Sequence, residues 1–247
     1  MDPLTTLAAS ALRARMESLE MLANNLANAE TGGFKADREF YGLYTAPEAL
    51  DAPEANPPAA LPVIERPWTD FSQGTIRSTG NPLDLAITGR GFFGVHGPGG
   101  PLYTRNGSMR LSASGVLETA RGHALRAAGG GVIQARSPDP IEVRADGSVI
   151  QSGQALGTLE VVEFTDPAAL VKQGASYFRS ARPGETPAPA GAFTIGQGRL
   201  ESSNVTSAEG AVRLVSVMRQ FEMLQKAVAL GAEMNRRAVE EVARVGS

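Results

Sequence analysis

Two helix-forming stretches at the ends of the chain constrain its fold more than any other feature. Over residues 3 to about 28, apolar side chains recur at alternating steps of three and four, at Ala9, Leu12, Met16, Leu19, Ala23 and Leu26. Asp2 is a candidate N-cap, and Pro3 suits the first helical position because its missing N–H would have no partner there. We expect a helix whose apolar stripe needs a partner.

The second stretch covers residues 206 to 245, which contain no proline. Its stripe again steps by four and three, through Leu214, Met218, Phe221, Gln225, Val228, Ala232, Asn235, Val239 and Val242. Gln225 and Asn235 interrupt the apolar series. A polar residue in such a stripe can fix the register of helix packing, so Asn235 is a candidate for that role.

The chain between the helices divides into a linker and a β region. Residues 45–67 hold six of the 16 prolines and little periodicity, which is typical of an extended linker. From about residue 68 to 195, short apolar runs alternate with turn signals, of which Asn106-Gly107 and Asp146-Gly147 are the strongest. This spacing predicts antiparallel strands.

The predicted fold class is therefore α+β, with long amphipathic N- and C-terminal helices forming a coiled-coil-like helical domain around an inserted antiparallel β-rich domain. The expected boundaries are 1–44 for the N-terminal helix and the segment after it, 45–67 for the linker, 68–198 for the β domain and 199–247 for the C-terminal helix. Because lone amphipathic helices are marginal in water, we expect the ends to order fully on binding other chains.

Composition excludes several classes of function. The 247 residues include no cysteine, which removes thiol nucleophiles, disulfides and zinc–thiolate sites, and only two histidines. With 23 basic and 26 acidic residues the net charge is −3, which predicts no nucleic-acid partner. No apolar run reaches the ~18 residues of a membrane span, and the N-terminus lacks the pattern of a cleaved signal peptide.

Motifs for chemistry are weak, so we predict no catalytic, cofactor-binding or metal site. Residues 89–94 match G-x-G-x-x-G, but a glycine-rich turn follows instead of a helix. His96 and His123 are interpreted as turn residues, and the carboxylates of Glu201 and Glu209 as solvated loop charges. A carbohydrate-active β-domain enzyme, with two distant carboxylates, and a general coiled-coil adaptor stay open as alternatives.

Four strings resemble segments of the bacterial flagellar rod and hook proteins. They are residues 23–35 (ANNLANAETGGFK), 78–87 (STGNPLDLAI), 103–108 (YTRNGS) and 200–205 (LESSNV). The resemblance implies a structural axial subunit that is not an enzyme, is exported unfolded by the flagellar type III apparatus without a cleaved signal, and stacks helically into the periplasm-spanning rod. Its implied partners are other rod proteins and copies of itself.

The same resemblance implies that the terminal stripes make the subunit contacts. The expected apolar contacts join Leu12, Met16, Leu19 and Leu26 to Leu214, Met218, Phe221 and Val228 of the same or a neighbouring subunit. Asn24, Asn25 and Asn28 are expected to bond backbone groups at the helix end or across subunits. Asn235 completes the predicted interface.

Overall fold

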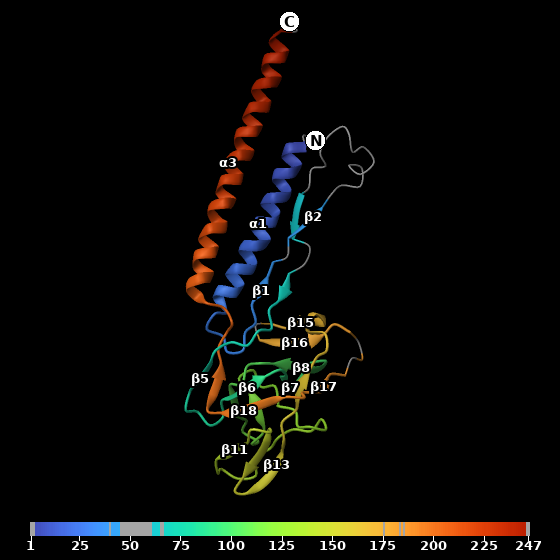
Figure 1. Ribbon diagram of the computed structural model, residues 1–247, viewed down its shortest axis with the longest axis vertical. Helices are drawn as coiled ribbons and strands as arrows, with labels where there is room; N and C mark the ends of the chain where they lie inside the picture. Colours follow the sequence, from blue (N-terminus) through green and yellow to red (C-terminus); the bar gives the residue numbers. More distant parts are fainter. Residues whose placement is uncertain are drawn as a thin grey trace. The chain divides into compact units, whose positions relative to one another are not determined.

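The computed structural model describes residues 3–39, 41–44, 61–64, 67–174, 176–182, 184 and 186–245. The chain divides into two compact units, each assembled from segments distant in sequence (Figure 1). The helix unit comprises Met1–Leu26, Asp37–Trp68 and Ser207–Ser247, and the β unit comprises Ala27–Ala36 and Thr69–Thr206. Most of the predicted linker, residues 45–60 and 65–66, lies outside the described residues.

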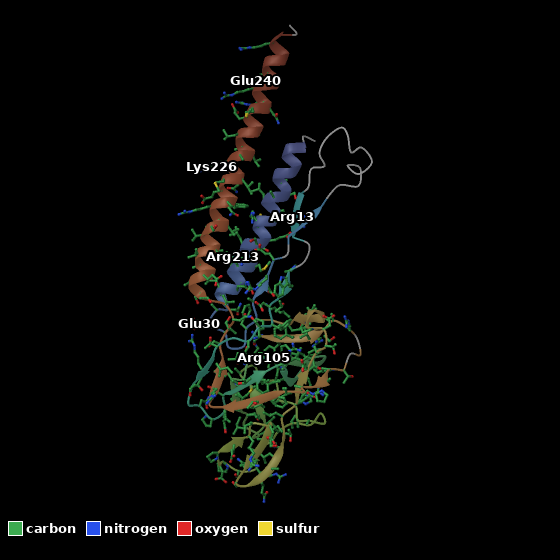
Figure 2. All side chains as sticks on the ribbon, in the orientation of Figure 1. Arg13, Glu30, Arg105, Arg213, Lys226 and Glu240 are labelled. Atoms are coloured by element: carbon green, nitrogen blue, oxygen red, sulfur yellow. The ribbon has the colours of Figure 1, made fainter. Side chains whose placement is uncertain are left out.

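The helix unit contains the two long helices, α1 (Pro3–Ala27) and α3 (Ser207–Val245). Both lie where the sequence predicts them, so the two helix predictions are confirmed; the candidate cap Asp2 lies outside the described residues. The unit also contains a pair of antiparallel strands, β2 (Tyr41–Tyr44) and β3 (Leu61–Ile64), which the sequence did not predict. Arg213, Lys226 and Glu240 mark positions along α3 in Figure 2.

The buried face of α1 is not its predicted stripe. Ala14, Ser18, Leu22 and Asn25 are buried, whereas Met16 of the stripe is 52% exposed. The hydroxyl of Ser18 donates to the Glu39 carboxylate. The Asn25 amide exchanges two hydrogen bonds with the backbone of Asp37, at 2.7 and 3.0 Å. This face therefore covers the segment that begins at β1 (Asp37–Arg38).

The β unit is built around a six-stranded sheet with the order β15-β16-β8-β7-β14-β17. Every neighbouring pair in this sheet is antiparallel. The strands, in that order, are Leu170–Lys172, Tyr177–Ser180, Gly100–Thr104, Phe92–Gly97, Val161–Glu163 and Ala188–Pro189. A 3₁₀ turn, η1 (Pro167–Ala169), precedes β15, and the Asp166 side chain caps it.

Smaller sheets complete the β unit. They pair β5 (Ile76–Ser78) with β19 (Arg199–Glu201), β6 (Leu85–Gly89) with β18 (Phe193–Gln197), and β9 (Met109–Leu111) with β10 (Leu117–Thr119). A three-stranded sheet joins β11 (Ile141–Val143), β12 (Ser148–Gln151) and β13 (Gln154–Thr158). A separate two-stranded sheet pairs β1, which belongs to the helix unit, with β4 (Trp68–Thr69).

Two apolar clusters fill the β unit. The larger gathers side chains from most strands, with Ile87, Val95, Ile133 and Val149 fully buried. The smaller is aromatic: Phe178 is fully buried, and its ring meets those of Phe71 and Phe92 edge-on at 5.2 and 5.7 Å. The apolar surface that drives folding is therefore concentrated in the strands, not in the helices.

The predicted fold class is wrong. The described chain is mostly β, with strands β1 to β19 against two α-helices of 25 and 39 residues, and the helices form no coiled-coil domain around an insert. Met218, in the middle of the predicted α3 stripe, is 47% exposed. The physical reason is that heptad spacing fixes which residues share a face but not what covers that face. In α1, the chain's own residues 37–39 bond to a different face.

Candidate functional site

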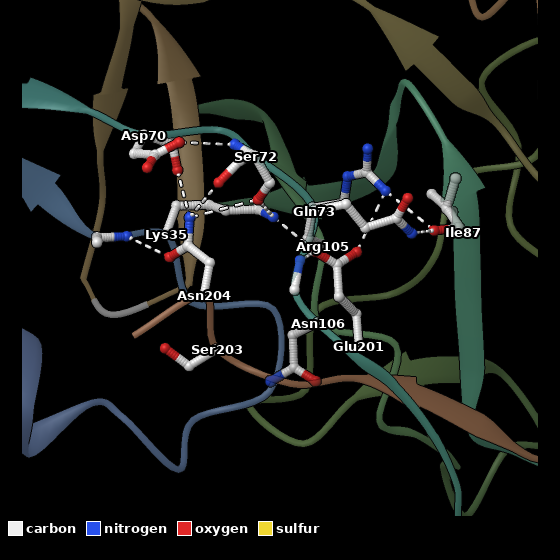
Figure 3. A network of polar contacts seen from close by, with 12 residues as sticks. Lys35, Asp70, Ser72, Gln73, Ile87, Arg105, Asn106, Glu201, Ser203 and Asn204 are labelled. Carbon is white, nitrogen blue, oxygen red and sulfur yellow. Dashed lines mark hydrogen bonds and ion pairs between the residues drawn. The ribbon is translucent and has the colours of Figure 1, made fainter. Parts of the chain in front are cut away.

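Two segments far apart in the chain meet inside the β unit. The Gly33 N–H donates to the Glu201 carbonyl at 2.8 Å, and the Asn204 N–H donates to the Phe34 carbonyl at 3.3 Å. The Ala36 N–H donates to the side-chain oxygen of Asn204 at 2.8 Å. The segment after α1 and the segment before α3 are thus bonded to each other (Figure 3).

Three buried charges lie at this meeting point, and we call Lys35, Arg105 and Glu201 the ionic junction. Their exposed fractions are 0%, 5% and 1%. The Lys35 ammonium lies 2.5 Å from Glu201 Oε1, and Arg105 Nη1 lies 3.2 Å from Glu201 Oε2. Each carboxylate oxygen thus faces a different cation (Figure 3), the charge-assisted geometry that makes hydrogen bonds strongest.

Backbone groups make further hydrogen bonds to the three side chains of the junction. The Gly74 N–H donates to Glu201 Oε1 at 3.0 Å, and Lys35 Nζ donates to the Ser72 carbonyl at 2.6 Å. Arg105 donates from Nη1 to the Ile87 carbonyl at 3.1 Å and from Nη2 to the Gly89 carbonyl at 2.6 Å. The junction therefore connects the segment after α1 with residues 72–74, with β6, with Arg105 directly after β8, and with β19.

Burial dominates the electrostatics of both cations. It lowers the pKa of Lys35, and the nearby Glu201 carboxylate opposes that shift. Burial likewise lowers the pKa of Arg105, again against the Glu201 charge. Charges this deeply buried are stable only when paired. All three side chains are at least 95% buried, so their mutual pairing is shielded from water and fastens the segments together.

Further polar contacts surround the junction. The Asn204 amide donates to the Asp70 carbonyl at 2.8 Å, which ties residues 70–72 to the C-terminal segment. Lys172 Nζ donates to the Lys35 carbonyl at 2.7 Å and lies 4.4 Å from the centroid of the Phe34 ring. The backbone on both sides of Lys35 is therefore held by groups from three separate segments.

Glycine permits the close approach of backbones at this site. Gly33 has φ +66°, and a Cβ there would lie 2.3 Å from both the carbonyl carbon of Arg105 and the nitrogen of Asn106. A Cβ on Gly74 would lie 2.0 Å from the Ser202 carbonyl oxygen. Both separations are far below contact distance, so only glycine fits at either position.

The structure separates the predicted interface residues into three groups. Asn25 is buried and bonded to the Asp37 backbone, and Asn28 accepts a hydrogen bond from the Thr31 hydroxyl at 3.2 Å. The half-buried group is Leu12, Leu19, Leu26, Leu214, Phe221 and Val228. The exposed group is Met16, Asn24, Met218 and Asn235. In the single chain the apolar residues of the predicted interface are therefore mostly half-buried, and only Met16 and Met218 among them are exposed.

Sequence reasoning missed the ionic junction. The interpretation of Glu201 as a solvated loop charge is wrong, because its carboxylate is buried between Lys35 and Arg105. Local periodicity could not reveal this pairing, since Lys35 and Glu201 are 166 residues apart. The available signal was that Lys35, Arg105 and Glu201 each fall inside one of the four strings that resemble the flagellar proteins.

The weak chemical motifs have structural roles. Residues 89–94 run from the end of β6 into β7, so no helix follows the glycine string, as predicted. His96 lies in β7, which corrects its assignment to a turn, and the His123 ring meets Tyr177 edge-on at 5.2 Å. Within the described ranges, no three His, Asp or Glu side chains are grouped as metal ligands would be.

Comparison with known families assigns the chain to a class of structural proteins. Residues 7–35 match the family "Flagella basal body rod protein", residues 86–152 the "Flagellar hook protein FlgE/F/G D1 domain", and residues 197–241 the "Flagellar basal body rod FlgEFG protein C-terminal". The match to residues 7–35 ends in the segment that contains Lys35, and the match to residues 197–241 begins just before Glu201. The ionic junction joins these two segments.

Individual relatives agree with this assignment along most of the chain. The flagellar basal-body rod protein FlgF of Caulobacter vibrioides is 32% identical over 228 residues, 92% of each chain. FlgF of Mesorhizobium japonicum is 31% identical over 87% of each chain. FlgG of Buchnera aphidicola is 30% identical over 95% of this chain and 97% of its own. The chain belongs to the flagellar basal-body rod protein family, and its relatives include proteins named FlgF and proteins named FlgG.

Removing the charge of Glu201 is expected to destabilise the fold more than removing the charge of Lys35. Glu201→Gln leaves two buried cations without their shared counterion, and breaking a buried pair in this way costs about 3 to 5 kcal/mol of unfolding free energy. Lys35→Met costs less, because Glu201 keeps Arg105 and the Gly74 N–H. Urea denaturation of both variants, followed by circular dichroism, measures the difference. Equal losses would contradict the shared-counterion description.

Gly33 and Gly80 form a matched pair for testing the close approach. Both have positive φ, but a Cβ on Gly80 has nothing within 4 Å. Gly80→Ala should therefore cost only the left-handed strain, about 1 to 2 kcal/mol. Gly33→Ala should lower the unfolding free energy by clearly more, since the backbone of Arg105 must move. Denaturant midpoints of the two variants measure this difference. Similar losses of unfolding free energy in both would contradict the close approach of the Gly33 and Arg105 backbones.

The lowered pKa of Lys35 predicts a pH dependence of stability. Between the folded-state pKa and the ordinary value of 10.5, the unfolded chain binds more protons than the folded chain. The unfolding free energy contributed by Lys35 therefore rises with pH across this window, by up to about 1.4 kcal/mol per pH unit. The difference in unfolding free energy between the unaltered chain and Lys35→Met should grow from pH 7.5 to pH 10. A difference that stays constant with pH would contradict a pKa of Lys35 lowered by burial.

Proposed function

We propose that this chain is a structural subunit of the flagellar basal-body rod and occupies the proximal position as a FlgF protein. The observation that carries the proposal is the similarity to proteins named FlgF over 87 to 92% of this chain. The string RQFEM at residues 219–223 also supports it, because the distal type, FlgG, tends to carry an Arg-Ala-Tyr-Glu-like string there. A distal position is the second candidate, favoured by the long matches to FlgG.

The buried junction supports a mechanical role and not a catalytic one. It fastens the segment after α1 to the segment before α3, and its charged groups are buried. A subunit that transmits torque must resist being pulled apart where its helices join its folded body. No enzymatic activity is needed for that task, and we assign none.

The exposed apolar residues of α3 support assembly with other subunits. Six large apolar side chains on this helix are exposed by 47% or more: Val212, Val215, Met218, Met223, Leu230 and Met234. Burying a side chain of this size contributes about 1.5 to 3 kcal/mol. Repeated over many copies, such contacts give a stiff helical filament, and we assign the predicted interface residues Met16 and Met218 to them.

Assembly outside the cytoplasm requires export. We propose that the chain passes through the flagellar type III apparatus without a cleaved signal peptide and then joins copies of itself and other rod proteins around the export channel. Neither described helix has an apolar stretch long enough to cross a membrane. No nucleic acid has a part in this function.

Charge placed on the exposed stripes should stop assembly without unfolding the chain. Met16→Asp and Met218→Asp change exposed side chains, so unfolding free energies should shift by no more than about 0.5 kcal/mol. Both variants should abolish rod formation and swimming in cells lacking their own copy. Electron microscopy of isolated basal bodies measures rod formation, with Val132→Asp, an exposed apolar position in the β unit, as the control.

Two outcomes would contradict the proposal in different ways. Normal rods in Met16→Asp and Met218→Asp cells would show that these residues are not subunit contacts. Failure of the unaltered chain to restore rods in cells lacking FlgF would contradict the proximal assignment itself.

A further inference from the structure

A cleft in the β unit lies beside the ionic junction and has no part in fastening the segments. Its volume is 340 Å³. Three aromatic rings line it, from Phe71, Phe92 and Phe164, together with Arg90 and Arg105. Phe92 lies edge-on to both other rings, at 5.7 and 6.1 Å between centroids. The rings give the cleft an apolar wall suited to a flat or aliphatic group.

Arg105 brings an incompletely paired guanidinium to this cleft. Its Nη1 and Nη2 donate to Glu201 and to the carbonyls of Ile87 and Gly89, but its buried Nε has no hydrogen-bond partner. The guanidinium carbon lies 5.6 Å from the centroid of the Phe92 ring. A buried N–H without an acceptor is costly, so an acceptor that settles next to this guanidinium would be favoured.

The polar rim of the cleft carries one charge of each sign. Arg90 Nη1 lies 3.4 Å from Glu163 Oε1, and the Arg90 side chain is 88% exposed against 30% for Glu163. An exposed ion pair of this kind contributes little and exchanges partners readily. The Arg90 guanidinium is therefore available to an incoming anion, whereas Glu163 repels one.

We propose that this cleft binds a carboxylate carried on an aromatic or aliphatic group. The ring or chain packs against Phe71, Phe92 and Phe164, and the carboxylate is held by Arg90 at the mouth and by the field of Arg105 beneath it. A purely apolar ligand would offer no acceptor to Arg90 or to the unpaired Nε of Arg105. A ligand with several negative charges would meet the repulsion of Glu163. This binding is independent of the proposed rod function.

The same chemistry occurs in a free acid and in a protein segment that places an aromatic residue beside an acidic one. The experiment uses 3-phenylpropionate for the first source and the capped dipeptide acetyl-Phe-Glu-amide for the second. 3-Phenylpropionamide, which has the same shape without charge, is the control ligand. Titration of the full-length ¹⁵N-labelled chain, followed by amide chemical shifts, should show saturable changes at Gly91 and Thr165 for at least one carboxylate. Tighter binding of the dipeptide would identify a protein segment as the ligand, and tighter binding of the free acid a small molecule.

Three variants make the test specific. Arg90→Gln should weaken carboxylate binding about tenfold. Glu163→Gln removes the repulsive charge and should strengthen binding about twofold to fivefold. Arg110→Gln, which breaks an exposed pair with Glu118 outside the cleft, should leave binding unchanged. Absence of binding by both carboxylates, equal binding of the amide, or equal effects of Arg90→Gln and Arg110→Gln would overturn the proposal.

Discussion

The buried pairing of one carboxylate with two cations is the constraint on which the β unit depends. Glu201 faces Lys35 on one oxygen and Arg105 on the other, and none of the three side chains is more than 5% exposed. Isolated charges in such a site would be far too costly, so all three segments must be present before any can be buried. The β unit therefore folds fully only when the segment after α1 and the segment before α3 are both in place. An apolar core alone would not impose that requirement.

This requirement connects the fold to the proposed task. Gly33 and Gly74 allow backbones to cross where any side chain would collide, and the hydrogen bonds of Asn204 extend the contact along both segments. α1 and α3 leave the junction within a few residues on either side, at Ala27 and Ser207. Force applied along either helix reaches the β unit through these bonds. The exposed apolar residues of α3 then remain for contacts with other chains.

Prediction from sequence succeeded where the signal was local. The positions of α1 and α3 follow from periodicity, from Pro3 at the start of α1 and from the absence of proline over residues 206–245. The hairpin of β11 and β12 follows from the turn dipeptide Asp146-Gly147. It failed where distant residues decide the environment of a side chain. The sequence around Glu201 is typical of a solvated loop charge. Its carboxylate is buried because Lys35 and Arg105 pair with it. The coiled-coil-like domain failed for the same reason, since an apolar stripe does not specify its partner.

Local sequence patterns account for the two helices, for the antiparallel strands in the middle of the chain and, through four short strings, for the family. These properties depend on residues that are neighbours in the chain, where spacing directly sets geometry. The tertiary structure alone decided that Lys35, Arg105 and Glu201 share one site, that α1 buries Ser18 and Asn25 instead of Met16, and that a cleft forms between Arg90 and Phe164. Each of these depends on contacts between residues far apart in sequence, and such contacts form only when the whole β unit and its flanking segments fold together.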